Sequence, residues 1–196
     1  MRKAEIKRTT AETDIEVKLV LGGDGKYDIK SGSGFFDHML EQFARHGGFD
    51  LFLRCKGDTQ VDFHHSAEDC GIALGSAFLK ALGDKRGICR YGWAVLPMDE
   101  ALILCAADLS GRTCVNFDVS FPDEYRLGDM DSELIKEFFL AFARSCPMAL
   151  HLKKLYGENN HHVAEGVFKA FAKVMAQAVK IDPERGDALP TTKGVL

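Results

Sequence analysis

The chain has 196 residues, 46% of them hydrophobic and 28% charged, which is typical of a globular protein with one sizeable core. Its net charge of −4 argues against nucleic acid as the main partner, and no apolar run is long enough to span a membrane. Six scattered cysteines without a CxxC motif, and an N-terminus without an apolar signal segment, predict reduced, mostly buried thiols in a cytoplasmic protein.

The first half of the chain predicts a strand-like region, a helix, a strand and a second helix, in that order. Residues 14–32 read as extended, and Gly-Gly-Asp-Gly at 22–25 predicts a hairpin turn within them. A helix over 36–45 precedes an extended segment at 49–55, whose apolar residues alternate. The helix that begins at His64 has an apolar face formed by Cys70, Ala73, Leu74, Ala77, Phe78, Ala81 and Leu82.

The second half of the chain repeats this order of elements. Residues 101–119 are strand-like, a helix is expected over 136–145, and alternation at 148–156 predicts a strand. The helix that begins at His161 has an apolar face formed by Val167, Phe168, Phe171, Val174, Met175 and Ala178.

Residue matches between the halves indicate an internal repeat. The helix and strand that precede each histidine pair align at an offset of 99 residues, as Ala44 does with Ala143. The motif HHxxE, which begins at His64, recurs from His161 at an offset of 97 residues. A two-residue difference in the intervening turn accounts for the change in offset.

The sequence therefore predicts an α+β fold built by internal duplication of a sheet-plus-two-helix unit. The division falls near Arg86–Trp93 and gives two halves, 1–88 and 89–196, within one compact domain. Two sheets that each carry helices on one face would join into a single three-layer body.

The repeated HHxxE motif is the strongest indication of chemistry. On a helix the glutamate lies one turn from the histidines, so each half places a carboxylate beside an imidazole. Adjacent histidines point about 100° apart, which favours two neighbouring ions, or one ion and a second site across an interface. One copy would be an ordinary polar helix start, but two equivalent copies favour a site for Mn, Fe, Co, Ni or Zn. A structural zinc is less favoured because the motif contains no cysteine.

A further histidine extends the predicted ligand set. His38 lies near the start of the helix expected at 36–45, and its repeat equivalent is Glu137. The pseudo-symmetric set for two ions is then His38, His64, His65, Glu68, Glu137, His161, His162 and Glu165. His151 lies on the second predicted strand, and a role beside a ligand and a purely structural role both stay open.

Several runs of sequence resemble one enzyme family. The runs GFFDHMLEQFARHGGFDL, DFHHSAEDCGIALG, DLSGR, LYGENNHHVAEGVFKAFA and LPTTKGVL closely resemble the imidazoleglycerol-phosphate dehydratase family of histidine biosynthesis. The resemblance extends from Arg8 to the last residue. The expected fold is similar to the second domain of ribosomal protein S5.

The chain departs from the family pattern in two places. Many members have His-Phe-Phe where this chain has Glu137, Phe138 and Phe139, and that histidine is a manganese ligand. Either Glu137 binds the ion instead, or one ion has a different ligand set, and the repeat favours ligation by Glu137. The terminal Thr-Thr-Lys replaces the more usual Ser-Ser-Lys or Ser-Thr-Lys and keeps the hydroxyl groups.

The resemblance implies a hydro-lyase that removes water from D-erythro-imidazole-glycerol phosphate to give imidazole-acetol phosphate. The proton to be lost is not acidic, so two divalent ions, expected to be Mn²⁺, would bind the ring nitrogens and let the ring accept electron density. The family assembles into a 24-subunit shell with its sites where subunits meet. The resemblance therefore implies a homo-oligomer that binds a small phosphorylated imidazole compound.

The resemblance also implies roles for individual residues. Glu12 matches the family's catalytic or substrate-contacting glutamate, with Glu165 and Glu68 as alternatives for the acid–base group. From the residues alone, Glu12 would be an ordinary solvated charge. The positions implied to bind the substrate or its phosphate are Glu12, His38, His64, Glu68, Arg90, Arg112, His161, Lys169, Thr191, Thr192 and Lys193. Lys169 follows Glu165 by one helical turn and is expected to share its face.

Two other functions compete with this reading when the residues are considered alone. A binuclear metallohydrolase would use the same ligand types to activate a water molecule. A non-catalytic nucleic-acid-binding module would share the α+β repeat, since fold does not imply function. The acidic net charge and the lack of a basic, aromatic-rich stripe disfavour that module.

Overall fold

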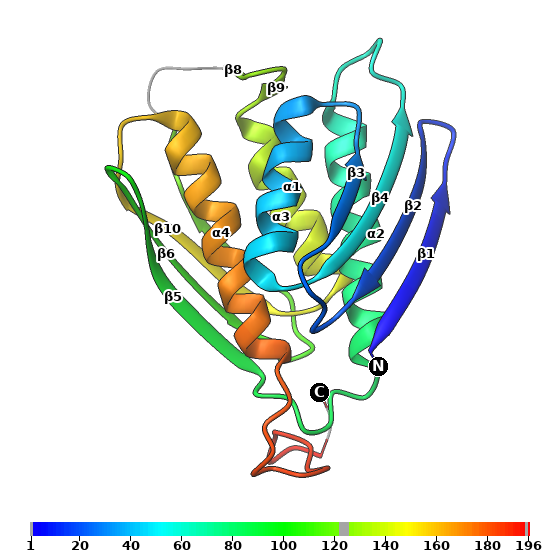
Figure 1. Cartoon of the computed structure of the whole chain (residues 1–196), viewed down its shortest axis with the longest axis vertical. Coiled ribbons are helices and arrows are strands. Elements are labelled where there is room, and N and C mark those ends of the chain that lie inside the picture. Colours follow the sequence, from blue (N-terminus) through cyan, green and yellow to red (C-terminus); the bar gives the residue numbers. More distant parts are fainter. Residues whose placement is uncertain (1, 122–125, 195) are drawn as a thin grey trace.

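The computed structural model describes residues 2–121, 126–194 and 196, and Figure 1 shows its architecture. The first half forms a sheet and two helices, as the sequence predicts. In chain order its elements are β1 (Lys3–Thr9), β2 (Thr13–Val20), β3 (Tyr27–Lys30), α1 (Gly34–Gly47), β4 (Asp50–Gly57) and α2 (His64–Leu82).

Apart from two additional short strands, the second half has the same order of elements and the same sheet topology. Its elements are β5 (Tyr91–Met98), β6 (Ala101–Asp108), β7 (Cys114–Asp118), β8 (Arg126–Leu127), β9 (Met130–Asp131), α3 (Glu133–Ser145), β10 (Ala149–Tyr156) and α4 (Asn160–Val179). The strand orders are β1-β2-β4-β3 and β5-β6-β10-β7, and β8 pairs with β9 in a separate short ribbon. The predicted duplication is therefore confirmed in strand order as well as in helix order.

The four helices lie between the two sheets, which confirms the expected three-layer body (Figure 1). α2 packs along α3 and α1 packs along α4, so each pair joins one helix from each half. All four helices begin at the same end of the molecule, whereas the C-terminal segment lies at the opposite end (Figure 1). The division predicted at 88 falls in the connection between α2 and β5. Within the described residues, no helix is both long and apolar enough to cross a membrane.

Phenylalanine side chains form the centre of the helical layer. Phe43 of α1 stacks on Phe171 of α4, and Phe138 of α3 stacks on Phe168 of α4, each pair with ring centroids 5.4 Å apart. Such pairs add about 0.5–1.5 kcal/mol each to the free energy gained from burying their area. The apolar faces predicted for α2 and α4 are buried throughout, so these helix predictions are confirmed.

The hairpin predicted at residues 22–25 is wrong. β2 and β3 do not pair, because β4 lies between them, antiparallel to β2 and parallel to β3. Asp50 at the start of β4 accepts hydrogen bonds from the backbone amides of Asp24 and Lys26, at 2.9 and 3.0 Å. These hydrogen bonds attach the glycine-rich turn to the start of β4. The chain then enters β3 on the side of β4 opposite β2. A local turn signal does not encode that choice of partner strand.

The sequence patterns do not reveal β1 and β5, each of which is one of the two edge strands of its sheet. β1 is mostly charged, and β5 contains Gly92 and Pro97, which both weaken a strand prediction. An edge strand has one partner only and tolerates these residues. Gly92 also allows close packing, because a Cβ at this position would collide with the backbone carbonyl of Val174 in α4.

All six cysteines are free thiols, but fewer are buried than the sequence predicts. Cys70, Cys105 and Cys146 are buried, whereas Cys114 is exposed at the start of the edge strand β7. Burial raises the pKa of Cys146 to about 12, so this thiol stays protonated and unreactive at neutral pH. The expectation of mostly buried thiols is thus right for half of them.

The close packing of α2 on α3 predicts the effect of a single methyl group. A Cβ at Gly75 would lie 2.5 Å from the carbonyl oxygen of Phe142. Alanine favours a helix by up to about 1 kcal/mol, but overpacking costs about 1–3 kcal/mol, so we expect Gly75→Ala to lower the free energy of unfolding by about 1–2 kcal/mol. Urea unfolding followed by circular dichroism measures the loss.

Gly34→Ala is the matched control, because a Cβ at this exposed helix position meets no atom closer than 3.8 Å. We expect this variant to be as stable as the wild type or slightly more stable. A Gly75→Ala variant that also matched the wild type would contradict the close approach of α2 and α3.

Candidate active site

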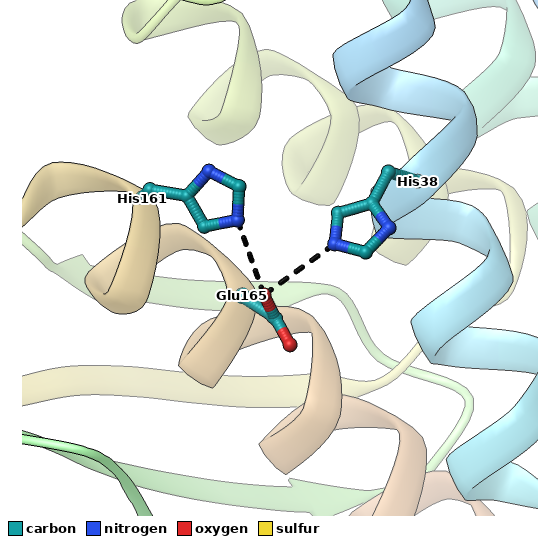
Figure 2. Close-up of side chains that lie close together, drawn as sticks. All are labelled: His38, His161 and Glu165. Atoms are coloured by element: carbon teal, nitrogen blue, oxygen red, sulfur yellow. Dashed lines mark hydrogen bonds and ion pairs between the residues drawn. The ribbon is translucent and has the colours of Figure 1, made fainter.

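His38, His161 and Glu165 meet between α1 and α4 (Figure 2). One carboxylate oxygen of Glu165 lies 3.4 Å from Nε2 of His38 and 3.2 Å from Nε2 of His161. One nitrogen or oxygen atom from each residue lies within 4.8 Å of the others, and no second group of this kind occurs in the described part of the chain. The first half supplies His38 and the second half supplies the other two residues, so both halves build this cluster.

Helix caps place these side chains. The side chain of Asn159 accepts hydrogen bonds from the backbone amides of His161 and His162, which sets the first turn of α4. On α1, Ser33 caps the helix, and Asp129 from the β8–β9 turn accepts hydrogen bonds from two backbone amides of the first turn. The start of α1, which carries His38, is therefore held by a residue from the second half.

Glu165 is a buried carboxylate, 7% exposed, and its charge is balanced locally. Nζ of Lys169 lies 2.5 Å from its second oxygen, so the contact predicted from the one-turn spacing is present. Burial by itself raises the pKa of Glu165. The hydrogen bond and charge of Lys169, together with those of His38, outweigh burial and leave the pKa below its ordinary value. Glu165 is therefore ionised at neutral pH.

The second histidine of each motif engages a carboxylate outside the cluster. Nδ1 of His65 lies 3.0 Å from Asp58, and Nδ1 of His162 lies 2.6 Å from Glu100. The hydrogen bond with Asp58 raises the pKa of His65, and the bond with Glu100 raises the pKa of His162 and lowers that of Glu100 to about 2. A carboxylate on one ring nitrogen is typical of histidines that bind a metal through the other.

Glu12 and Glu100 occupy equivalent places in the two halves. Glu12 lies in the turn between β1 and β2, with Oε1 3.7 Å from Nε2 of His65. Glu100 lies in the turn between β5 and β6, where Asp99 is 3.5 Å from Nε2 of His162. The structure thus brings Glu12 to a predicted ligand. Sequence reasoning missed Asp99 and Glu100, which an extension of the repeat to these strands would have revealed.

The structure does not bring the remaining predicted ligands into one cluster. Glu68 lies 3.4 Å from Arg144 of α3 rather than beside His64. Glu137 is half-buried on α3, and among the described residues it has no ion pair. Because α2 packs on α3 as α1 packs on α4, these three predicted ligands occupy places equivalent to those in the observed cluster.

A pocket of about 510 Å³ gathers most of the residues predicted to bind phosphate. Sequence reasoning missed Arg185, which lines this pocket with Arg90, Arg112, Thr191, Thr192 and Lys193. The guanidinium of Arg90 donates two hydrogen bonds to Asp108, at 2.7 and 3.0 Å, and one to the carbonyl of Pro190. Cations and hydroxyl groups in one concave site suit a phosphate group. Lys169 lies apart from this pocket, beside Glu165.

A profile of the family described as imidazoleglycerol-phosphate dehydratase matches residues 31–175. The chain belongs to the imidazoleglycerol-phosphate dehydratase family. The imidazoleglycerol-phosphate dehydratase of Cereibacter sphaeroides is 55% identical over 196 residues, which cover all of both chains. That of Caldanaerobacter subterraneus is 53% identical, again over the whole of both chains.

Solved structures of imidazoleglycerol-phosphate dehydratases have the same fold. The enzyme from Staphylococcus aureus superposes with a TM-score of 0.83 at 32% identity, over 92% of this chain and 99% of that chain. The enzyme from Pyrococcus furiosus, solved in complex with (S)-C348, gives 0.84 at 37% identity, over 97% and 100%. The predicted α+β fold and the predicted family are both confirmed.

Family membership makes the chain a dehydratase of histidine biosynthesis that acts on a phosphorylated imidazole compound. A metallohydrolase is not favoured. His151 is exposed on β10 between the buried Leu150 and Leu152, and it takes no part in the cluster or in the phosphate pocket.

The pairing of Glu165 with Lys169 predicts a pH-dependent loss of stability. Lys169→Met leaves a buried carboxylate without its cation, so we expect the free energy of unfolding at pH 7 to fall by about 1–3 kcal/mol. Glu165 has a depressed pKa in the folded state, so its contribution is present above the pKa of the unfolded chain, about 4.3, and is lost below it. The difference from the wild type should therefore shrink below about pH 4.

Urea unfolding at pH 7 and at about pH 3, with a chelator present, measures this difference. Lys173→Met is the matched control, since Lys173 is exposed one turn further along α4. A loss in Lys169→Met that stayed constant with pH would contradict the role of the Glu165 charge.

Proposed function

We propose that the chain is a metal-dependent dehydratase that converts D-erythro-imidazole-glycerol phosphate to imidazole-acetol phosphate and water. The observation that carries the proposal is the cluster of His38, His161 and Glu165, which offers two ring nitrogens and a carboxylate oxygen within 4.8 Å. Imidazole and carboxylate ligands suit divalent ions of the first transition row, and Mn²⁺ is the ion expected here.

The residues present fit such an ion. Glu165 is ionised, and both histidines present Nε2 toward its carboxylate, so the three donor groups already converge. When bound, a divalent ion would draw electron density from the imidazole ring of the substrate. The equivalent places on α2 and α3 would hold a second ion through His64, Glu68 and Glu137. The repeat and the matching helix packing support Glu137 as a ligand in place of the family's histidine.

His65 and His162 fit a different role, as ligands for ions in neighbouring copies of the chain. Each ring has Nδ1 beside a carboxylate and is partly exposed, 33% for the side chain of His65 and 27% for that of His162. A histidine oriented by a carboxylate in this way presents Nε2 as a metal ligand. Because neither ring faces the cluster of its own chain, each would complete a half-site on a neighbour.

The position of the phosphate pocket supports a site shared between subunits. His161 lies at the start of α4, whereas the backbone amide of Arg90 bonds to the carbonyl of Ala178 near its end. These points are about 26 Å apart along the helix, at 1.5 Å per residue. Three carbon atoms link the ring of the substrate to its phosphate ester, a reach of under about 10 Å. One chain therefore does not hold both ends of one substrate molecule.

This separation and an exposed apolar face support a homo-oligomer, which we propose to be the 24-subunit shell of the family. Tyr91, Trp93 and Val95 on β5 are 51%, 71% and 56% exposed, on the face of the sheet opposite the helices. Neighbouring exposed aromatic side chains are typical of protein–protein contacts. Six free thiols favour a reducing compartment, so we place the shell in the cytoplasm.

The acid–base group and the phosphate ligands would come from opposite ends of the folded subunit. Among Glu12, Glu68 and Glu165, Glu12 is the best suited to exchange a proton with the substrate, because it is exposed and, among the described residues, pairs with no lysine or arginine but only with the imidazole of His65. Lys169 neutralises Glu165, and Arg144 pairs with Glu68. The guanidinium of Arg90 is oriented by Asp108 and, with Arg112 and Lys193, would hold the phosphate.

Metal content and product formation test the proposal together. Protein purified with Mn²⁺ should contain about two ions per chain and form imidazole-acetol phosphate. His161→Ala and Glu137→Ala each remove one ligand, so we expect each to lose about one ion and its turnover. His151→Ala is the control, and it should keep the full metal content and the full turnover. Full activity in His161→Ala, or hydrolysis of the phosphate ester without dehydration, would contradict the proposal.

Mixed oligomers test whether the site is shared. His161→Ala and Arg112→Ala damage opposite ends of the folded subunit, and each alone should be inactive. If each site combines ends from different subunits, co-expression should restore up to about a quarter of wild-type activity, since that fraction of sites joins two intact ends. Co-expressed His161→Ala and Glu165→Gln, which damage the same end, should stay inactive. No recovery in the first mixture would place the whole site within one chain.

A further inference from the structure

Three polar side chains follow one face of α1 away from the cluster. His38, Gln42 and His46 are spaced four residues apart, one helical turn each. Nε2 of the Gln42 amide lies 3.5 Å from Nδ1 of His38, and Nε2 of His46 lies 3.2 Å from Oε1 of the same amide. Nε2 of His38 faces Glu165. Both nitrogens of the His38 ring therefore have a polar partner.

A neutral histidine that binds a metal must carry its ring proton on the nitrogen that does not bind the ion. If Nε2 of His38 binds an ion through its lone pair, Nδ1 must carry the proton and needs an acceptor. The two ends of a glutamine amide exchange places by a half-turn of its terminal bond. Gln42 then accepts the proton of His38 through Oε1 and donates its NH₂ group to Nε2 of His46. One amide thus satisfies both rings.

The surroundings of His46 support its part as an acceptor. Burial lowers the pKa of His46, and the positive charges of Lys169 and Lys173 lower it further. The ring is therefore neutral at pH 7 and has one nitrogen with a free lone pair. A neutral His46 accepts a hydrogen bond from the NH₂ group of Gln42. A protonated His46 ring would instead donate to Oε1 of Gln42 and compete with Nδ1 of His38 for that acceptor.

The repeat supplies an internal comparison. At the places equivalent to His38, Gln42 and His46, α3 carries Glu137, Ala141 and Ser145. A carboxylate ligand has two equivalent oxygens and no tautomers to choose between. The amide is thus present on the helix that offers a histidine and absent from the helix that offers a glutamate.

We infer that Gln42 is a positioning residue that fixes the His38 ring with Nδ1 protonated and Nε2 free to bind the metal, with His46 orienting the amide. The inference rests on the proposed metal site and adds to it. It also makes the two half-sites unequal, because only the cluster on α1 and α4 depends on an amide.

Mn²⁺ titration of the full-length assembled protein tests the inference, with free Mn²⁺ followed by electron paramagnetic resonance. Gln42→Met keeps the length of the side chain and removes its polar atoms. We expect the affinity for one of the two ions to fall by about 10–100-fold, and that for the other to stay unchanged. Gln42→Glu keeps an acceptor for Nδ1 and should bind both ions at least as tightly as the wild type. Gln177→Met makes the same substitution on α4, remote from His38, and should change neither affinity.

The outcomes separate this inference from the proposed function. Glu165→Gln reports directly on the cluster. If it binds Mn²⁺ as the wild type does, no ion is held there, and the proposed site and this inference both fail. If Glu165→Gln loses an ion but Gln42→Met binds normally, the inference alone is overturned. Equal weakening by Gln42→Met and Gln42→Glu would also overturn it, since the side chain would then act through packing and not through an acceptor.

Discussion

The buried carboxylate of Glu165 is the interaction on which the site depends. With 7% of its surface exposed, it requires partners, because an uncompensated buried charge is strongly destabilising. Lys169 and His161 meet it from α4, and His38 meets it from α1. Since His38 belongs to the other half of the repeat, the contact that satisfies this charge also fixes α1 against α4. The same contact gathers the atoms of the proposed metal site, so stability and site geometry have one physical origin.

The parts of the structure that are local or repeated could be predicted from the sequence. Helical spacing is sufficient to place Lys169 and His161 beside Glu165, and the repeat predicts the order of elements in both halves. The turn at 22–25 shows the limit, because its outcome depends on Asp50, which is distant in the sequence. Residues such as Glu100 could not be predicted from the sequence for a related reason. Nothing local distinguishes them from solvated polar side chains until the fold places a histidine ring beside them.

The two halves keep their backbone arrangement and differ in the chemistry they carry. The glutamate in the first strand turn and the second histidine of the motif meet in both halves, as Glu100 and His162 show most closely. By contrast, His38 is matched by Glu137 on α3. A neutral imidazole leaves the charge of a divalent ion unchanged, whereas a carboxylate reduces it by one unit. The duplication therefore fixes where the predicted ligands lie, and this single exchange would make the two proposed metal sites electrostatically unequal.

The direction of the helices supports the proposal that the active site is shared between subunits. All four helices begin at one end of the molecule (Figure 1). His161 lies at that end, and the 20 residues of α4 separate it from Arg90 of the phosphate pocket. No side-chain movement brings these ends together, because the separation is set by the helix itself. In the proposed assembly a single subunit holds two incomplete sites, and each becomes complete only against the opposite end of a neighbouring subunit. Under that proposal, subunit association supplies both substrate affinity and the remaining metal ligands, so loss of contacts between subunits would lower activity even where every fold-determining residue is intact.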